Sequence, residues 1–154
     1  MKKVITSSMI AIFAMFLVVL SADVANAQPR WARGRQRVAV SQTIQRLETE
    51  TDRFSREINR SLDNSRRETR RREDRIEDRV RDLENATDEL RREFDRRGDT
   101  WWETRENVSK VVAAARNVNR LMRDRRLNNM SGNSWQRVQR EVNALAGYYG
   151  LPRV

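Results

Sequence analysis

The sequence predicts an all-α fold, and three observations support this prediction. Gly and Pro are scarce, with five and two residues among 154, and no run of β-branched residues is present. Apolar residues recur at steps of three and four, the spacing of one face of an α-helix. The chain has no Cys, so helix packing rather than disulfides must hold the fold. We therefore expect an antiparallel bundle of four helices.

The first 27 residues resemble a cleaved signal peptide in composition. Lys2 and Lys3 give a basic start, residues 9–20 form an apolar run, and residues 25–27, Ala-Asn-Ala, fit a cleavage site. A retained membrane anchor is the alternative, but a spanning helix needs roughly 20 apolar residues. We expect the mature chain to begin at Gln28 and to be periplasmic or secreted.

Residues 28–40 are predicted to form a flexible basic arm, because they hold Pro29, Gly34 and four arginines and show no helical period before Val38. An unstructured leader left by processing is the alternative. Trp31 is a candidate exposed aromatic for a membrane surface, a base or a sugar. The candidate contacts to an anionic partner in this arm are Arg30, Arg33, Arg35 and Arg37.

Residues 41–154 are predicted to form a single domain. Its first two helices cover about 41–62, with Ser41 as N-cap, and about 66–97, with a capping box that starts at Ser65. Their apolar stripes differ in phase by about one residue, so we expect a turn between them. One continuous helix of nearly 57 residues in a coiled coil is the alternative. The stripes are Ile44, Leu47, Thr51, Phe54 and Ile58, then Ile76, Val80, Leu83, Thr87, Leu90 and Phe94.

The second helix is densely charged but nearly neutral, since residues 66–97 hold twelve Arg and eleven Asp plus Glu. Interleaved charges cancel at the distance of a phosphate backbone, so we interpret this helix as scaffold rather than as a nucleic-acid contact. Its narrow apolar stripe needs a cover, which a homodimer or another partner helix could supply.

Gly98 is predicted to end the second helix, and a capping box at Thr100 to begin the third, at about 100–125. The third helix has a broad apolar face, which is typical of a bundle interior. Residues 127–133 are predicted to be a loop, and the fourth helix follows at about 134–147, with Asn133 as its cap.

Surplus positive charge lies on either side of the second helix. Net charge is +10, to which residues 28–40 contribute +4 and residues 99–154 contribute +5. The helix dipole alone would favour cations at the end of the third helix, but a patch for an anionic envelope polymer, lipid head groups or nucleic acid is the functional alternative. Export argues against nucleic acid. The candidate contacts are Arg116, Arg120, Arg123, Arg125 and Arg126.

No constellation typical of an enzyme is found. Without His or Cys the chain has no imidazole or thiol catalyst and lacks the usual zinc and copper ligands. Arginines surround the acidic pairs at 73–74 and 77–78, which favours an ion-paired face over a metal site. We therefore predict no catalytic residue, cofactor or metal. In the aromatic pairs 101–102 and 148–149, Trp102 and Tyr148 are the expected exposed members.

These features favour an exported, non-enzymatic structural or interaction module of the cell envelope, whose partner is an anionic envelope component or a helix. A helical periplasmic chaperone or stress protein is one alternative. A basic nucleic-acid-binding protein is the other.

The predicted cleavage can be tested by intact mass spectrometry of protein from the periplasmic or secreted fraction. We expect a chain that starts at Gln28. The Ala27→Trp variant should accumulate as precursor, because the residue before the cleaved bond must be small. Asn26→Gln, at the adjacent tolerant position, should be processed normally. A wild-type chain that starts at Met1 would contradict the prediction.

Overall fold

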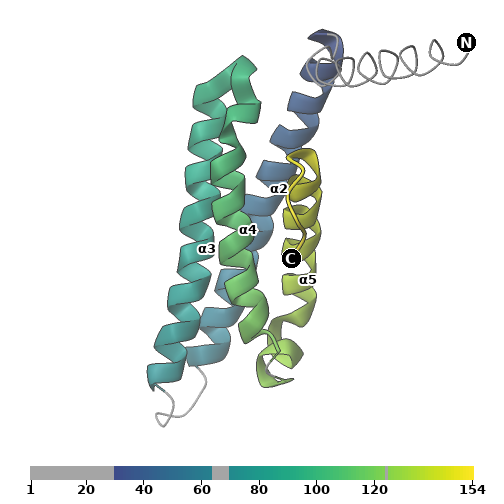
Figure 1. Cartoon of the computed structure of the whole chain (residues 1–154). Coiled ribbons are helices and arrows are strands. Elements are labelled where there is room, and N and C mark those ends of the chain that lie inside the picture. Colours follow the sequence, from purple (N-terminus) through teal and green to yellow (C-terminus); the bar gives the residue numbers. More distant parts are fainter. Residues whose placement is uncertain (1–29, 64–69, 124) are drawn as a thin grey trace, which may run out of the picture. The chain divides into compact units, whose positions relative to one another are not determined.

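The computed structural model describes residues 30–63, 70–123 and 125–154, which are mostly helical and contain no strand (Figure 1). The chain divides into two units, Met1–Arg35 and Gln36–Val154, and the second unit holds the apolar core. Within the described residues the elements are α2 (Arg30–Asp63), α3 (Arg70–Arg97), the 3-10 helix η4 (Gly98–Thr104), α4 (Arg105–Leu121) and α5 (Arg125–Tyr148). The predicted all-α class is confirmed.

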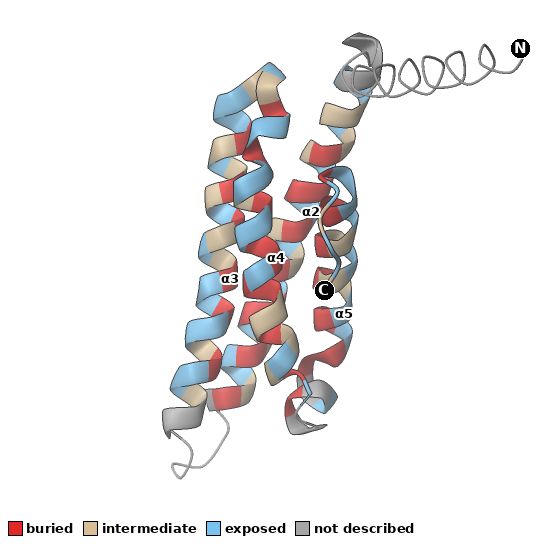
Figure 2. Cartoon of the chain, in the orientation of Figure 1, coloured by how far each residue is buried: buried red, intermediate tan, exposed pale blue. Residues whose placement is uncertain are grey.

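The helices form a bundle-like arrangement around an apolar core. Successive α-helices run in opposite directions in Figure 1, and Figure 2 shows their buried residues on the sides that face one another. Each α-helix contributes fully buried side chains to one contiguous cluster, among them Ile44, Leu83, Val111 and Leu145. The core is therefore shared by α2, α3, α4 and α5.

The two apolar stripes identified in the sequence lie in this core. Every residue of both stripes is buried, from Ile44 to Ile58 on α2 and from Ile76 to Phe94 on α3. The α3 stripe is therefore covered within the chain and is not available as the seam of a homodimer. Because α2 and α3 are separate helices of opposite direction, the alternative of one continuous helix is wrong. The predicted capping box at Ser65 lies outside the described residues.

The predicted flexible arm is wrong for its larger part, because α2 already begins at Arg30. Arg, Gln and Ala predominate after Pro29, and these residues favour the helix even without an apolar period. Val40 is fully buried and extends the stripe one step before Ile44. Ser41 is consequently an interior helical residue and not an N-cap.

The predicted third helix, 100–125, is divided into η4 and α4. Gly98 has a φ of +54° and ends α3 as expected, because glycine adopts this left-handed conformation at little cost. Thr100 does not cap a helix: its φ and ψ are −102° and 32°, and its hydroxyl donates to the Arg97 carbonyl at 3.1 Å. Trp101, the inward member expected of its aromatic pair, lies in the core on this 3-10 helix.

The predicted loop at residues 127–133 is also wrong, because α5 begins at Arg125 and includes Asn133. Polar residues such as Ser favour loops because their side chains compete for backbone groups. Here the Ser131 hydroxyl donates to the Leu127 carbonyl at 3.1 Å, one helical turn earlier. Both residues are buried, so packing overrides local composition.

Tyr149 joins the end of α5 to η4. Its hydroxyl lies 2.8 Å from Thr104 Oγ1 and 3.2 Å from the Trp101 carbonyl oxygen. The rings of Tyr149 and Trp101 meet edge to face with centroids 5.5 Å apart, and Arg105 Nε donates to the Tyr149 carbonyl at 3.2 Å. Burial raises the pKa of the Tyr149 hydroxyl from 10.0 to about 12.

The Tyr149→Phe variant should lower the free energy of unfolding by about 1 kcal/mol near neutral pH, because the hydrogen bonds of a buried hydroxyl are lost. Since folding raises the pKa of Tyr149, its neutral form stabilises the fold fully below pH 10, and this contribution declines as the pH rises toward about 12. Denaturant unfolding across this range should show a steeper alkaline loss in wild type than in Tyr149→Phe. The exposed neighbour provides the control, Tyr148→Phe, which should match wild type; identical alkaline profiles for all three proteins would contradict the assignment.

Phe54 offers a test of the core. Its ring is fully buried and lies 5.3 Å from that of Trp135, centroid to centroid. Phe54→Ala should cost about 3–5 kcal/mol in unfolding free energy, through lost burial and a remaining void. Val38→Ala, at a side chain 56% exposed on the same helix, should change it little. Similar denaturation midpoints for the two variants would refute the packing.

Candidate functional site

Positive charge is unevenly distributed among the helices. Residues 36–63 of α2 hold five basic and five acidic side chains, and α3 holds ten of each. Residues 105–154, which cover α4, α5 and the C-terminal tail, hold ten basic and only three acidic side chains. The surplus of the described helices therefore lies on α4, α5 and the tail.

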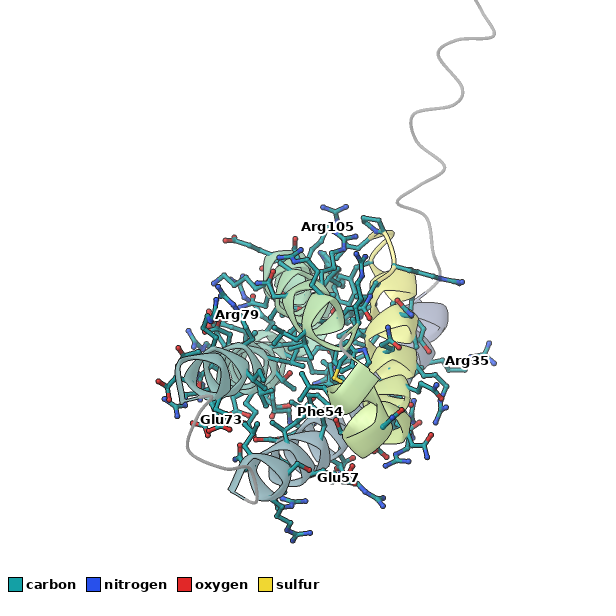
Figure 3. All side chains as sticks on the ribbon, turned by 90° about the horizontal axis from the view of Figure 1, so that it is seen from below. Arg35, Phe54, Glu57, Glu73, Arg79 and Arg105 are labelled. Atoms are coloured by element: carbon teal, nitrogen blue, oxygen red, sulfur yellow. The ribbon has the colours of Figure 1, made fainter. Side chains whose placement is uncertain are left out.

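Several charges on α3 form ion pairs on its own surface. Arg79 donates to Asp82 at 3.1 Å, Arg91 to Asp95 at 2.9 Å, and Arg96 to Glu93 at 2.7 Å. In Figure 3, Arg79 and Glu73 point outward from this helix. Exposed pairs of this kind contribute little stability individually, and because α3 holds ten basic and ten acidic side chains it has no net charge to attract a ligand.

A second group of charges holds neighbouring helices together. Arg46 on α2 contacts Glu141 on α5 at 3.0 Å, and Arg137 on α5 contacts Glu50 on α2 at 2.8 Å. The side chains of the second pair are only 27% and 24% exposed, so solvent screens this pair less than the others. These arginines serve the packing of α2 on α5.

Lys110 on α4 has the same kind of role toward α3. Its Nζ lies 3.0 Å from Glu89 Oε1, and the hydrogen bond to that carboxylate raises the pKa of Lys110. Asn107 Nδ2 donates to the same Glu89 oxygen at 3.3 Å. The positive charge of Lys110 is therefore balanced by a carboxylate of the neighbouring helix.

Arg116 holds the C-terminal tail against α4. Its Nη2 donates to the carbonyl oxygens of Pro152 at 3.1 Å and Arg153 at 3.2 Å. The tail is also fixed to α5, because the Val154 N–H donates to Asn143 Oδ1 at 2.8 Å. Both partners of Arg116 are neutral carbonyl groups, so they do not balance the positive charge of its guanidinium group. No local pattern in the sequence predicts this contact, which joins residues 36 and 37 positions apart.

Arg120 follows Arg116 on the same side of α4 after four residues, and Arg123 lies three residues further on, in the turn after the helix ends at Leu121. Arg120 and Arg123 are both exposed. The Arg120 guanidinium contacts the Asn117 side chain, which is neutral, and no ion pair to a carboxylate involves either arginine in the described part of the chain. We name Arg116, Arg120, Arg123 and the exposed Arg153 the basic surface.

The other predicted contacts are not brought to this surface. Arg37 forms an ion pair with Asp99 of η4 at 3.8 Å, and Arg35 is exposed in the Met1–Arg35 unit. The side chains of the remaining candidates lie outside the described residues; these are Arg30, Trp31, Arg33, Arg125 and Arg126.

Trp102 and Tyr148 are 42% and 37% exposed, whereas their neighbours Trp101 and Tyr149 are buried. Trp102 lies on η4, with its ring edge to face against Trp101 at a centroid distance of 6.1 Å. Within the described residues, no three acidic side chains are grouped as a metal site would require, and no helix has the length and apolarity to cross a membrane.

Comparison with known proteins finds no matching family model, no significantly similar curated protein and no significantly similar solved structure.

Proposed function

We propose that this protein is an exported, non-enzymatic interaction module of the cell envelope, built as one antiparallel four-helix bundle, that binds a polyanionic partner through its basic surface. The observation that carries the proposal is the charge imbalance: residues 105–154 have ten basic and three acidic side chains, whereas α3 is neutral. A field of one sign on one part of a rigid scaffold attracts and orients a partner of opposite charge.

The arrangement on α4 suits an extended array of anionic groups. At a rise of 1.5 Å per residue, Arg116 and Arg120 lie about 6 Å apart along the axis of α4, and Arg123 follows in the turn after Leu121. The helix backbone fixes this spacing, while the exposed side chains of Arg120 and Arg123 can adapt to the partner. Guanidinium groups bind phosphate and carboxylate oxygens bidentately, which a point charge cannot do.

The partner class is an anionic lipid surface or an acidic envelope polymer, because both present phosphate or carboxylate groups in rows. Removal of residues 1–27 on export places the mature chain where such partners occur and where nucleic acid is scarce. Each arginine at an anionic surface contributes about 1 kcal/mol of binding free energy at moderate salt.

The test is co-sedimentation of the mature chain with vesicles of zwitterionic lipid, with and without anionic lipid. The Arg120→Gln/Arg123→Gln variant should bind anionic vesicles roughly 30-fold more weakly, the equivalent of about 2 kcal/mol. The matched control is Arg81→Gln/Arg92→Gln, two exposed arginines on α3, which has the same net charge as the test variant and should bind nearly as wild type.

Soluble polyphosphate and duplex DNA serve as competitors in the same assay. Polyphosphate should displace the protein from vesicles, and binding should fall steeply with salt. Equal losses in the two double variants would show that only net charge matters and would refute the basic surface. Tighter binding to DNA than to vesicles or polyphosphate would replace the envelope partner by nucleic acid.

A further inference from the structure

A cavity of about 430 Å³ lies between α2 and the first half of α5. Arg53 and Glu57 line it from α2, and Ser131, Ser134 and Arg137 line it from α5. Its volume falls in the range of small-molecule sites. None of the four arginines of the basic surface lines this cavity, so a ligand here is independent of the proposed function.

Small residues on a buried part of α5 create this cavity. Ser131, Gly132 and Ser134 are buried, although side chains of this size leave space that a bundle core would normally fill with Leu, Ile or Phe. Phe54 and Trp135, the chain neighbours of Arg53 and Ser134, pack their rings against each other. The space is lined almost entirely by polar groups, so it suits a polar occupant.

The carboxylate of Glu57 and the two serine hydroxyls in the cavity already take part in hydrogen bonds. Glu57 accepts from Arg53 Nε at 3.3 Å through one carboxylate oxygen and contacts the Ser134 hydroxyl through the other. The Ser134 hydroxyl also accepts from Arg137 Nη2 at 3.1 Å. The Ser131 hydroxyl donates to a backbone carbonyl.

Several donors, in contrast, have no hydrogen bond to another described residue. Arg53 uses only its Nε, which leaves both Nη groups, and Arg137 uses Nε and Nη2, which leaves Nη1. Asn129 and Asn133 are exposed and also line the cavity. Their side-chain amide groups likewise have no hydrogen bond to another described residue. The cavity therefore offers more unused N–H groups than unused acceptors. Several of these N–H groups belong to the guanidinium ions of Arg53 and Arg137.

We propose that this cavity binds a small oxyanion, a carboxylate or a phosphate group, between Arg53 and Arg137. Charge-assisted hydrogen bonds from guanidinium to these groups are among the strongest that proteins form. Glu57 and Glu50 each pair with one of the two arginines, so the anion binds through the guanidinium N–H groups that these pairs leave unused. The surplus of positive charge on the whole chain favours its entry.

The test is a titration of isotope-labelled mature protein with sodium phosphate or sodium acetate, at an ionic strength held constant with sodium chloride. Shifts of NMR signals should be confined to the amides of residues 131–134 and the side-chain Nε of Arg53 and Arg137. Arg53→Gln should weaken binding about tenfold or more, because a charged donor is removed. Arg56→Gln, three positions away and exposed, is the matched control and should bind as wild type.

A second variant, Ser131→Leu, fills the cavity and should abolish the shifts while circular dichroism shows an unchanged helix content. If that variant does not fold, the comparison of Arg53→Gln with Arg56→Gln decides alone. Shifts with phosphate only or with acetate only identify the ligand chemistry, and either supports the proposal. The absence of localised shifts with both anions, or equal binding by the Arg53 and Arg56 variants, overturns it.

The Arg120→Gln/Arg123→Gln variant separates this site from the basic surface. It should bind the small oxyanion as wild type does, whatever its behaviour with vesicles. A loss of oxyanion binding in this variant would overturn the assignment to the cavity.

Discussion

Helix α3 has too few uncharged residues to be stable by itself. Ion pairs between neighbouring turns contribute only a few tenths of a kcal/mol each, and isolated helices in water are marginal even when their propensities are good. The stripe from Ile76 to Phe94 must therefore be buried, and it lies in the apolar core to which the other α-helices also contribute. The same holds for each α-helix of the bundle, so none of them is expected to persist without the others.

Once the stripes are buried, the charges divide into three groups by what they touch. Several on α3 pair along their own helix, and those at the α2–α5 contact, such as Arg137 with Glu50, join two helices. On α4, the hydrogen-bond partners of Arg116 and Arg120 are neutral, so no carboxylate of the described part balances these two arginines. The most highly charged helix is thus the least suited to bind an anion, because its field is cancelled by its own carboxylates.

Apolar periodicity predicted the α2 and α3 stripes and, with Gly98, the end of α3, because these features depend on local spacing and on one backbone conformation. It failed at Arg30 to Val40, where helix propensity alone extends α2 through a segment with few apolar residues. The contacts of Arg116 with the tail and of Arg137 with Glu50 join residues 36 or more positions apart. No local pattern encodes such pairs, so the α4 arginines could be identified from the sequence but their contacts could not.

The failure at residues 127–133 has a different meaning. Asn, Ser and Gly there are typical of a loop, yet Ser131 and Gly132 are buried within α5. A helix that places such residues against a neighbour gives up apolar burial and leaves polar groups to be satisfied. Natural sequences depart from local rules mainly where function requires it. That the departure coincides with a donor-rich cavity between Arg53 and Arg137 is the reason to seek a ligand there rather than on the more conspicuous α3.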